Sequence, residues 1–185
     1  MTTLTLTGDD AADALLSDNG FALLVGMLLD QQIAMELAFV GPQRLAERLG
    51  GELEVAAVAA HDPGELEQLF RQKPALHRYP GSMAKRVRTL AAHLLEEHDG
   101  RAEAVWEEAT DGRDLRRRLE SLPGFGEQKA RIFLALLAKQ CGVRPEGWRE
   151  AAGEYGEPGH RSIADVTGPE SLEQVREFKR ARKAP

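Results

Sequence analysis

A pair of glycines between two helical segments most constrains what this chain can fold into. Residues 111–121 are predicted to form a short helix with an apolar side, and residues 129–141 a strongly apolar helix. Gly124 and Gly126 lie between them and suit a tight turn whose backbone angles most residues avoid. The pattern therefore predicts a helical hairpin at 112–141.

Helical spacing of apolar residues also dominates elsewhere, so the predicted fold class is all-α. The further predicted helices span 21–30, 33–50, 63–72, 82–98, 101–109 and a basic C-terminal helix that starts near Pro169. The predicted apolar faces are Ile33, Leu37, Val40, Leu45 and Leu49 in the second of these helices and Val87, Leu90, Ala91, Leu94 and Leu95 in the fourth. Residues 142–161 are predicted to be a loop, and only residues 4–7 alternate like a strand.

Composition limits the classes of protein that this chain can be. No apolar run approaches the roughly 20 residues of a membrane span, and the N-terminal residues lack a secretory signal. We therefore expect a protein of the cytoplasm without a membrane partner. Cys141 is the single cysteine, which excludes an internal disulfide and any four-cysteine zinc or iron–sulfur site. No metal and no cofactor are expected.

The net charge of −6 hides a division along the chain. Residues 1–70 carry a net −10, whereas residues 71–185 carry +4. Between Arg71 and Leu90 there are six cationic side chains and no acidic one. Such a run is most often a solvated helix face, but here it also predicts a surface for a polyanion.

The hairpin has the chemistry of a phosphate site. Gly124 and Gly126 expose backbone N–H groups at a helix N-terminus, where dipoles alone bind a phosphate oxygen. Lys129, in the first helical turn, adds a full positive charge. The alternative is an ordinary helical corner in which glycine only allows a tight turn.

The sequence around these glycines resembles the helix-hairpin-helix of the base excision DNA glycosylases related to endonuclease III, the HhH-GPD superfamily. The residues that carry this resemblance are Leu122, Pro123, Gly124, Phe125, Gly126, Lys129 and Ala130. Two more segments resemble the family in the same order. Residues 21–32 are similar to its first core helix with a glutamine-bearing loop, and residues 79–85 to the start of the helix before the hairpin.

The resemblance implies two helical lobes with a cleft between them. One lobe would comprise residues 1–20 and 142–185, and the other residues 21–141. The implied partner is double-stranded DNA that contains a lesion or a mismatch. The resemblance also implies a monomer that is associated with the nucleoid, as in bacteria. The implied DNA-binding residues are Gly124, Phe125, Gly126, Gln128, Lys129, Gln31, Gln32, Ser82, Lys85 and Arg86.

One departure bears on the reaction. Family members with lyase activity carry a nucleophilic lysine where this chain has Gln128, and Lys129 lies one residue further. That step turns a side chain by about 100° around a helix, so Lys129 is not expected to be the nucleophile. The cysteines of the family's iron–sulfur loop are also absent. The resemblance thus implies a monofunctional DNA glycosylase, a short form without the cluster and without AP-lyase activity.

The acid that would assist glycosidic cleavage is left open between two residues. A carboxylate is needed to stabilise an oxocarbenium-like sugar or to activate water. Family spacing points to Glu146, whereas the small apolar residues that precede Asp165 resemble the family's approach to its acid across a longer loop. Asp165 is the candidate we favour. The alternative interpretation of Asp165 is a residue that caps the last helix. The alternative interpretation of Glu146 is an acid in a loop exposed to water.

Gln31 and Gln32 are candidates to fill the gap that a flipped base leaves, because an amide both donates and accepts hydrogen bonds. The alternative interpretation is that Gln31 and Gln32 are polar residues exposed to water at the end of a helix. Two main hypotheses remain: a monofunctional DNA N-glycosylase in base excision repair, or a non-catalytic helix-hairpin-helix module that binds DNA. A more distant third is a helical domain that binds an acidic protein.

Overall fold

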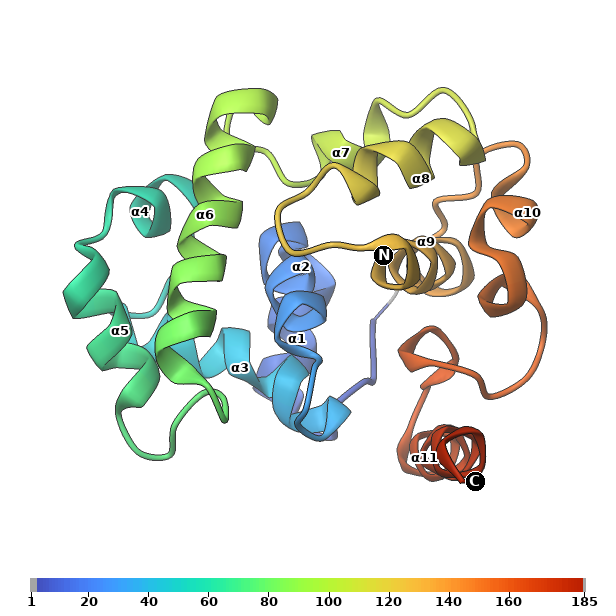
Figure 1. Cartoon of the computed structure of the whole chain (residues 1–185), viewed down its shortest axis with the longest axis horizontal. Coiled ribbons are helices and arrows are strands. Elements are labelled where there is room, and N and C mark those ends of the chain that lie inside the picture. Colours follow the sequence, from blue (N-terminus) through green and yellow to red (C-terminus); the bar gives the residue numbers. More distant parts are fainter. Residues whose placement is uncertain (1–2, 185) are drawn as a thin grey trace.

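The computed structural model describes residues 3–184, and over this range the chain is all-α (Figure 1). The α-helices are α1 Asp10–Asp18, α2 Gly20–Leu29, α3 Met35–Arg48, α4 Val55–Ala60, α5 Pro63–Arg71, α6 Pro80–His98, α7 Ala104–Glu107, α8 Gly112–Glu120, α9 Glu127–Gln140, α10 Trp148–Ala152 and α11 Pro169–Lys183. Two short 3₁₀ helices, η1 Gly153–Gly156 and η2 Ile163–Asp165, lie between α10 and α11. The all-α class predicted from the sequence is confirmed.

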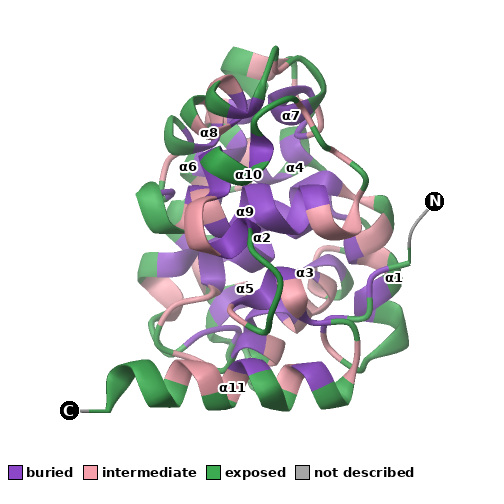
Figure 2. Ribbon diagram, turned by 90° about the vertical axis from the view of Figure 1, so that its right-hand side faces the viewer, coloured by how far each residue is buried: buried purple, intermediate pink, exposed green. Residues whose placement is uncertain are grey.

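Helix α2 forms the centre of the molecule, with all of its residues buried. Figure 1 shows α4 to α6 on one side of it, α7 to α10 on the other and α3 running below it. Figure 2 shows α2 and α9 as the most continuously buried helices. α2 also packs closely against α3, because a Cβ at Gly26 would lie only 2.5 Å from the ring of Phe39. Gly26 thus sets how near these two helices lie.

The predicted division into residues 1–20 with 142–185 and residues 21–141 stays a prediction, and the helix contacts show how each end of the chain is held. α1 packs against α2 and α3. The hairpin helices α8 and α9 pack instead against α10, and α9 also packs against η1 and η2. The reason is that α9 is apolar around most of its surface, so it is covered both by α8 and by the segments that follow it.

The hairpin turn itself packs against α2. Gly124 has a φ of +87°, and a Cβ built on it would overlap Leu28 Cδ1. Phe125 points into the core, where its ring meets Phe133 edge to face at 6.0 Å between centroids. Glycine at 124 is therefore required both by its backbone angle and by its closeness to α2.

The N-terminal strand predicted at 4–7 is wrong. Leu4 and Leu6 are buried as an alternating pattern suggests, but the segment pairs with side chains of α1 and not with another strand. The N–H of Leu4 donates to Ser17 Oγ at 2.9 Å, and that of Leu6 to Asp13 Oδ1 at 3.1 Å. Side-chain oxygens of a helix thus satisfy the backbone groups that a strand would have paired.

Two of the predicted apolar faces need correction. Leu37 is 48% exposed, because α3 buries the face of Met35, Phe39 and Pro42. Leu95 is 45% exposed near the end of α6, because that helix buries the face of Leu90, Ala91 and Leu94.

Two predicted boundaries also shift. α6 begins at Pro80, two residues before the predicted start at Ser82, since proline suits the first helical turn. The predicted loop at 142–161 contains α10 and η1, which form because Trp148, Ala152 and Tyr155 are buried. Asp62 is the N-cap of α5, since its carboxylate accepts from Glu65 N–H at 3.0 Å.

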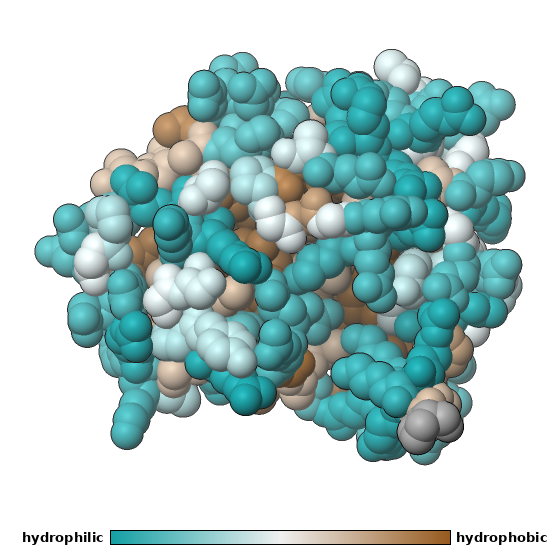
Figure 3. Space-filling view, viewed as in Figure 1, coloured by the Kyte–Doolittle hydropathy of each residue, from teal (hydrophilic) through white to brown (hydrophobic). Residues whose placement is uncertain are grey.

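Hydrophilic side chains cover most of the face drawn in Figure 3, and hydrophobic residues show mainly in recesses between them. Between residues 3 and 184, no single helix is long and apolar enough to cross a membrane, and only the pair α1 and α2, bent by 116°, meets those criteria together.

The two hairpin glycines should differ in what a methyl group costs. Gly124→Ala combines an unfavourable positive φ with an overlap against Leu28, so it should lower the free energy of unfolding by about 2–4 kcal/mol. Gly126→Ala is the matched control, because no atom lies within 4 Å of its Cβ position and its φ is −90°. Urea unfolding of both variants measures the difference. Equal losses would contradict the close approach of the hairpin to α2.

Candidate nucleic-acid interface

The N-terminus of α9 presents unpaired backbone donors. The first hydrogen bond of the helix runs from Ala130 N–H to Gly126 O at 3.0 Å, and no side chain caps the helix. The N–H groups of Glu127, Gln128 and Lys129 therefore have no partner within the helix. Gly126 is exposed, and nothing lies within 4 Å of its Cβ position, so a ligand can reach these donors closely.

Lys129 does not point along this N-terminus. Its ammonium donates to the carbonyl oxygens of Met27 at 2.6 Å and Leu28 at 2.9 Å, at the end of α2. Burial lowers the pKa of Lys129 to about 8, as do the positive charges of Arg86 and Lys179, while the charge of Asp30 opposes the shift. Lys129 thus joins the hairpin to α2 and is not the free phosphate ligand that the sequence suggested.

The connection from α2 to α3, residues 30–34, carries the two predicted glutamines and is called the glutamine loop below. Gln31 is partly buried, and its Nε2 donates to Leu28 O at 3.1 Å. Gln32 is exposed with a φ of +58°, and its Oε1 accepts from Tyr79 OH at 3.1 Å. The loop therefore lies against the start of α6.

The buried side chain of His77 connects this loop to the start of α6 through hydrogen bonds. Its Nε2 lies 3.1 Å from Leu29 O and 2.8 Å from Gln31 O, and its Nδ1 accepts from Tyr79 N–H at 3.0 Å. These contacts match a neutral imidazole with its proton on Nε2. Burial lowers the pKa of His77, and the positive Lys129 and Arg86 add to that effect, so the neutral form is favoured.

The cations of the chain differ in whether an acid neutralises them. In α8, Arg117 pairs with Asp114, and Arg116 pairs with Glu120 at 2.7 Å and with Glu127 at 2.9 Å. In α11, Arg176 pairs with Glu36, Arg180 with Glu173 and Arg182 with Glu154. The arginines of these two helices are thus largely neutralised by neighbouring carboxylates.

The start of α6 is different. Ser82, Lys85 and Arg86 are exposed, and no ion pair involves Lys85 or Arg86 within the described range. The Arg86 guanidinium lies 3.5 Å from Gln31 Oε1. Free positive charge therefore borders the glutamine loop.

Two other residues predicted to bind DNA have different surroundings. Phe125 is buried, so its side chain is part of the core and not of the surface. Gln128 is exposed, and its Nε2 donates to the hydroxyl of Tyr155 at 3.0 Å. Tyr155 and Trp148 are both buried, so their side chains attach the segment after the hairpin to the core.

Neither favoured acid lies at the hairpin turn. Asp165, whose side chain is 7% exposed, accepts from Lys139 Nζ at 2.7 Å and from Arg161 N–H at 2.8 Å. Lys139 is eleven residues after Gln128, which is about 16 Å along the axis of α9. Asp165 is thus part of a buried ion pair near the far end of that helix.

Glu146 is also distant from the turn. It is exposed, and its carbonyl accepts from Gly112 N–H at 2.7 Å, at the first residue of α8. The turn follows the last residue of α8, about 13 Å further along that helix. Spacing alone did not reveal this, because α10 and the 3₁₀ helices fold the intervening chain back onto α9.

Asp30 is the carboxylate that the sequence analysis missed. It follows α2 directly, and its N–H donates to Met27 O at 3.2 Å, the carbonyl that also accepts from Lys129. Burial raises the pKa of Asp30, and the nearby Lys179 and Lys129 oppose that rise. The sequence did contain a signal for this residue, because Asp30 stands directly between an apolar helix and the two glutamines.

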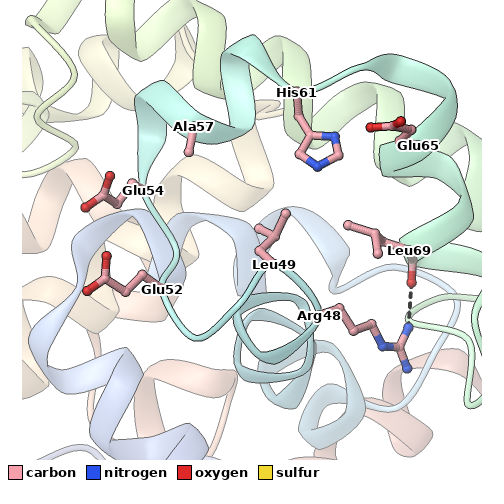
Figure 4. A pocket seen from close by; sticks show the side chains of 8 residues that line it. All are labelled: Arg48, Leu49, Glu52, Glu54, Ala57, His61, Glu65 and Leu69. Atoms are coloured by element: carbon pink, nitrogen blue, oxygen red, sulfur yellow. Dashed lines mark hydrogen bonds between the residues drawn. The ribbon is translucent and has the colours of Figure 1, made fainter.

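A surface pocket of about 490 Å³ lies elsewhere, between the end of α3, α4 and α5 (Figure 4). Its lining residues are Arg48, Leu49, Glu52, Glu54, Ala57, His61, Glu65 and Leu69. Arg48 spans part of it by donating to Leu69 O and Pro74 O, each at 2.6 Å. Its three glutamates make it unsuited to a phosphate. Within the described range, no group of three or more His, Cys, Asp or Glu side chains has an arrangement that could hold a metal ion.

The chain is similar to a known protein family and to a solved structure. The model of a family described as HhH-GPD superfamily base excision DNA repair protein matches residues 25–183. A solved structure of a trapped endonuclease III–DNA covalent intermediate, an estranged-adenine complex, is 18% identical, with a TM-score of 0.49, over 92% of this chain and 79% of the other. No curated protein sequence matches the chain.

Lys129 should give a pH-dependent contribution to stability. The folded protein binds its proton less tightly than the unfolded chain, so the penalty is complete below about pH 8 and fades as the pH rises towards 10.5. The free energy of unfolding of the wild type, relative to Lys129→Met, should therefore increase across that window. Urea unfolding at a series of pH values measures it, with the exposed Lys85→Met as control. Parallel curves for the wild type and Lys129→Met would contradict the burial of this amine.

Proposed function

Since the chain belongs to the HhH-GPD superfamily of base excision DNA repair proteins, we propose that it is a monofunctional DNA N-glycosylase. It flips a damaged or mismatched base out of the duplex and hydrolyses the bond between that base and its sugar. One observation carries the proposal: the free N-terminus of α9, the glutamine loop and the unpaired cations of α6 adjoin one another.

Phosphate binding follows from the groups at this junction. The unpaired N–H groups at the start of α9 bind a phosphate oxygen through the helix dipole. Lys85 and Arg86 hold further phosphates as charged ligands, and Ser82 lies one turn before Arg86. These contacts read no base, so binding is independent of sequence and sensitive to salt.

The glutamine loop supplies the groups for base flipping. Gln32 is exposed, and its amide is oriented by Tyr79. Gln31 lies next to it and accepts from Arg86. An amide that occupies the gap in the stack donates to and accepts from the orphaned base, and it costs less to desolvate than a charged group.

The absence of lyase activity is proposed from positions 128 and 129. A lyase needs a free amine close to the sugar, because it forms a Schiff base there. Position 128 is a glutamine bound to Tyr155, and the amine of Lys129 is held by two carbonyls of α2. Hydrolysis by water therefore leaves an intact abasic site.

A second candidate is a non-catalytic module that binds DNA through the same surface. The placement of Asp165 and Glu146 favours it, since both lie more than about 10 Å along a helix from the turn. The two candidates share the phosphate contacts and differ only in whether a carboxylate meets the sugar.

DNA affinity should depend on where a cation lies and not only on net charge. Arg86→Gln should weaken duplex binding about 3- to 10-fold and lower the salt dependence by about one phosphate contact. Arg101→Gln removes the same charge from a residue paired with Glu107 at 2.6 Å beyond the end of α6, so it should change binding less than about twofold. Fluorescence anisotropy at several salt concentrations measures both. Equal effects would place the DNA elsewhere.

Base excision should yield abasic sites without a covalent adduct. A panel of duplexes with damaged or mismatched bases is incubated with the protein, and each duplex strand is examined with and without alkali. We expect cleavage only after alkali and no product trapped by borohydride, since no free amine meets the sugar. Strand breaks without alkali would contradict the monofunctional mechanism, and excision from no duplex would favour the binding module.

A further inference from the structure

We propose that Asp30 is the carboxylate that faces the sugar during cleavage of the glycosidic bond, an inference that rests on the proposed glycosylase function. Neither of the two acids that the sequence offered lies at the hairpin turn. Asp165 and Glu146 lie at the far ends of α9 and α8.

Position is the first argument. Asp30 opens the glutamine loop, so it lies next to the residues that would enter the stack beside a flipped nucleotide. It also lies at the end of α2 where Lys129 of α9 is bound, since Met27 O accepts from both Lys129 Nζ and Asp30 N–H. A sugar whose phosphate is held at the start of α9 thus lies near this carboxylate.

The second argument is that the carboxylate of Asp30 has no hydrogen-bond or ion-pair partner in the described part of the chain. Over residues 3–184 its carboxylate accepts no hydrogen bond and lies in no ion pair within 4.0 Å. The other acid at the hairpin, Glu127, is bound by Arg116 at 2.9 Å and by Arg131 at 2.6 Å. A partly buried carboxylate without a partner is costly to the fold, which is a frequent property of groups kept for chemistry.

The reaction needs a group of this kind. The bond between C1′ and the base nitrogen breaks, its electron pair leaves with the base, and the sugar becomes positively charged. The Asp30 carboxylate stabilises that charge. A water oxygen then bonds to C1′, and its released proton passes through the carboxylate to the departed base nitrogen, so that the products are the free base and an abasic sugar.

The protonation of Asp30 agrees with this role. Burial raises its pKa, so the carboxylate accepts a proton more readily than an exposed aspartate does. Lys179 and Lys129 oppose the rise and keep the charged form accessible before the reaction. Since Lys129 is bound to two carbonyls, it does not cover the carboxylate by a direct ion pair.

A charged mimic of the sugar tests the proposal without turnover. Two duplexes are compared by fluorescence anisotropy, one with a neutral tetrahydrofuran abasic analogue and one with a pyrrolidine analogue that is positively charged at neutral pH. The wild type should bind the pyrrolidine duplex at least about tenfold more tightly, because a carboxylate faces the charge. Asp30→Asn should bind both duplexes equally while its affinity for the neutral duplex is retained, and Asp30→Glu should keep part of the preference.

Glu146→Gln is the matched control, since it removes one carboxylate distant from the turn, and it should keep the full preference. Asp30→Ser serves as a second uncharged variant, and circular dichroism melting verifies that each variant is folded. The proposal is overturned if the wild type shows no preference, if both uncharged variants keep it, or if Asp165→Asn is the variant that abolishes it. Failure to excise any base would instead count against the proposed glycosylase, because this comparison requires no excision.

Discussion

The ammonium of Lys129 at the end of α2 is the contact on which the arrangement of the interface depends. It donates to two carbonyls in the last turn of α2, at the negative end of that helix dipole. The same carbonyls also accept from Asp30 N–H and Gln31 Nε2. The two groups are about a hundred residues apart in the chain, so this contact sets the hairpin against the glutamine loop. Because the lysine is used in this way, the backbone N–H groups of α9 remain as the donors for an anion.

Charge acts in this protein through its placement and not through its sum. The chain is acidic overall, and the arginines of α8 and α11 are mostly paired with carboxylates three or four residues away or on neighbouring segments. Exposed pairs of this kind add little stability, but they remove the positive field from those surfaces. Lys85 and Arg86, which border the glutamine loop, form no ion pair among residues 3–184, so more of the positive field remains there.

The parts that could be predicted from the sequence are those that depend on neighbours in the chain. The hairpin, most helix bounds and the cap at Asp62 follow from local spacing and from the residues that begin and end helices. The role of Asp165 could not be predicted in this way, because its partner Lys139 is brought to it by α10 and two 3₁₀ helices. The surroundings of Asp30 likewise depend on α9 and α11, which are distant in sequence.

The hydrogen bonds of His77 affect which residues of the glutamine loop can be substituted. His77 holds the glutamine loop through the carbonyls of Leu29 and Gln31, which every residue type possesses, and not through the side chains that face outwards. The path of the loop is therefore separate from the identity of its exposed residues. The positive φ at position 32 favours residue types that tolerate this angle, such as asparagine or glycine. Position 31 does not have a positive φ, so its residue type is not restricted in this way. Related chains can thus exchange the groups that meet an orphaned base while the loop beneath them keeps one shape.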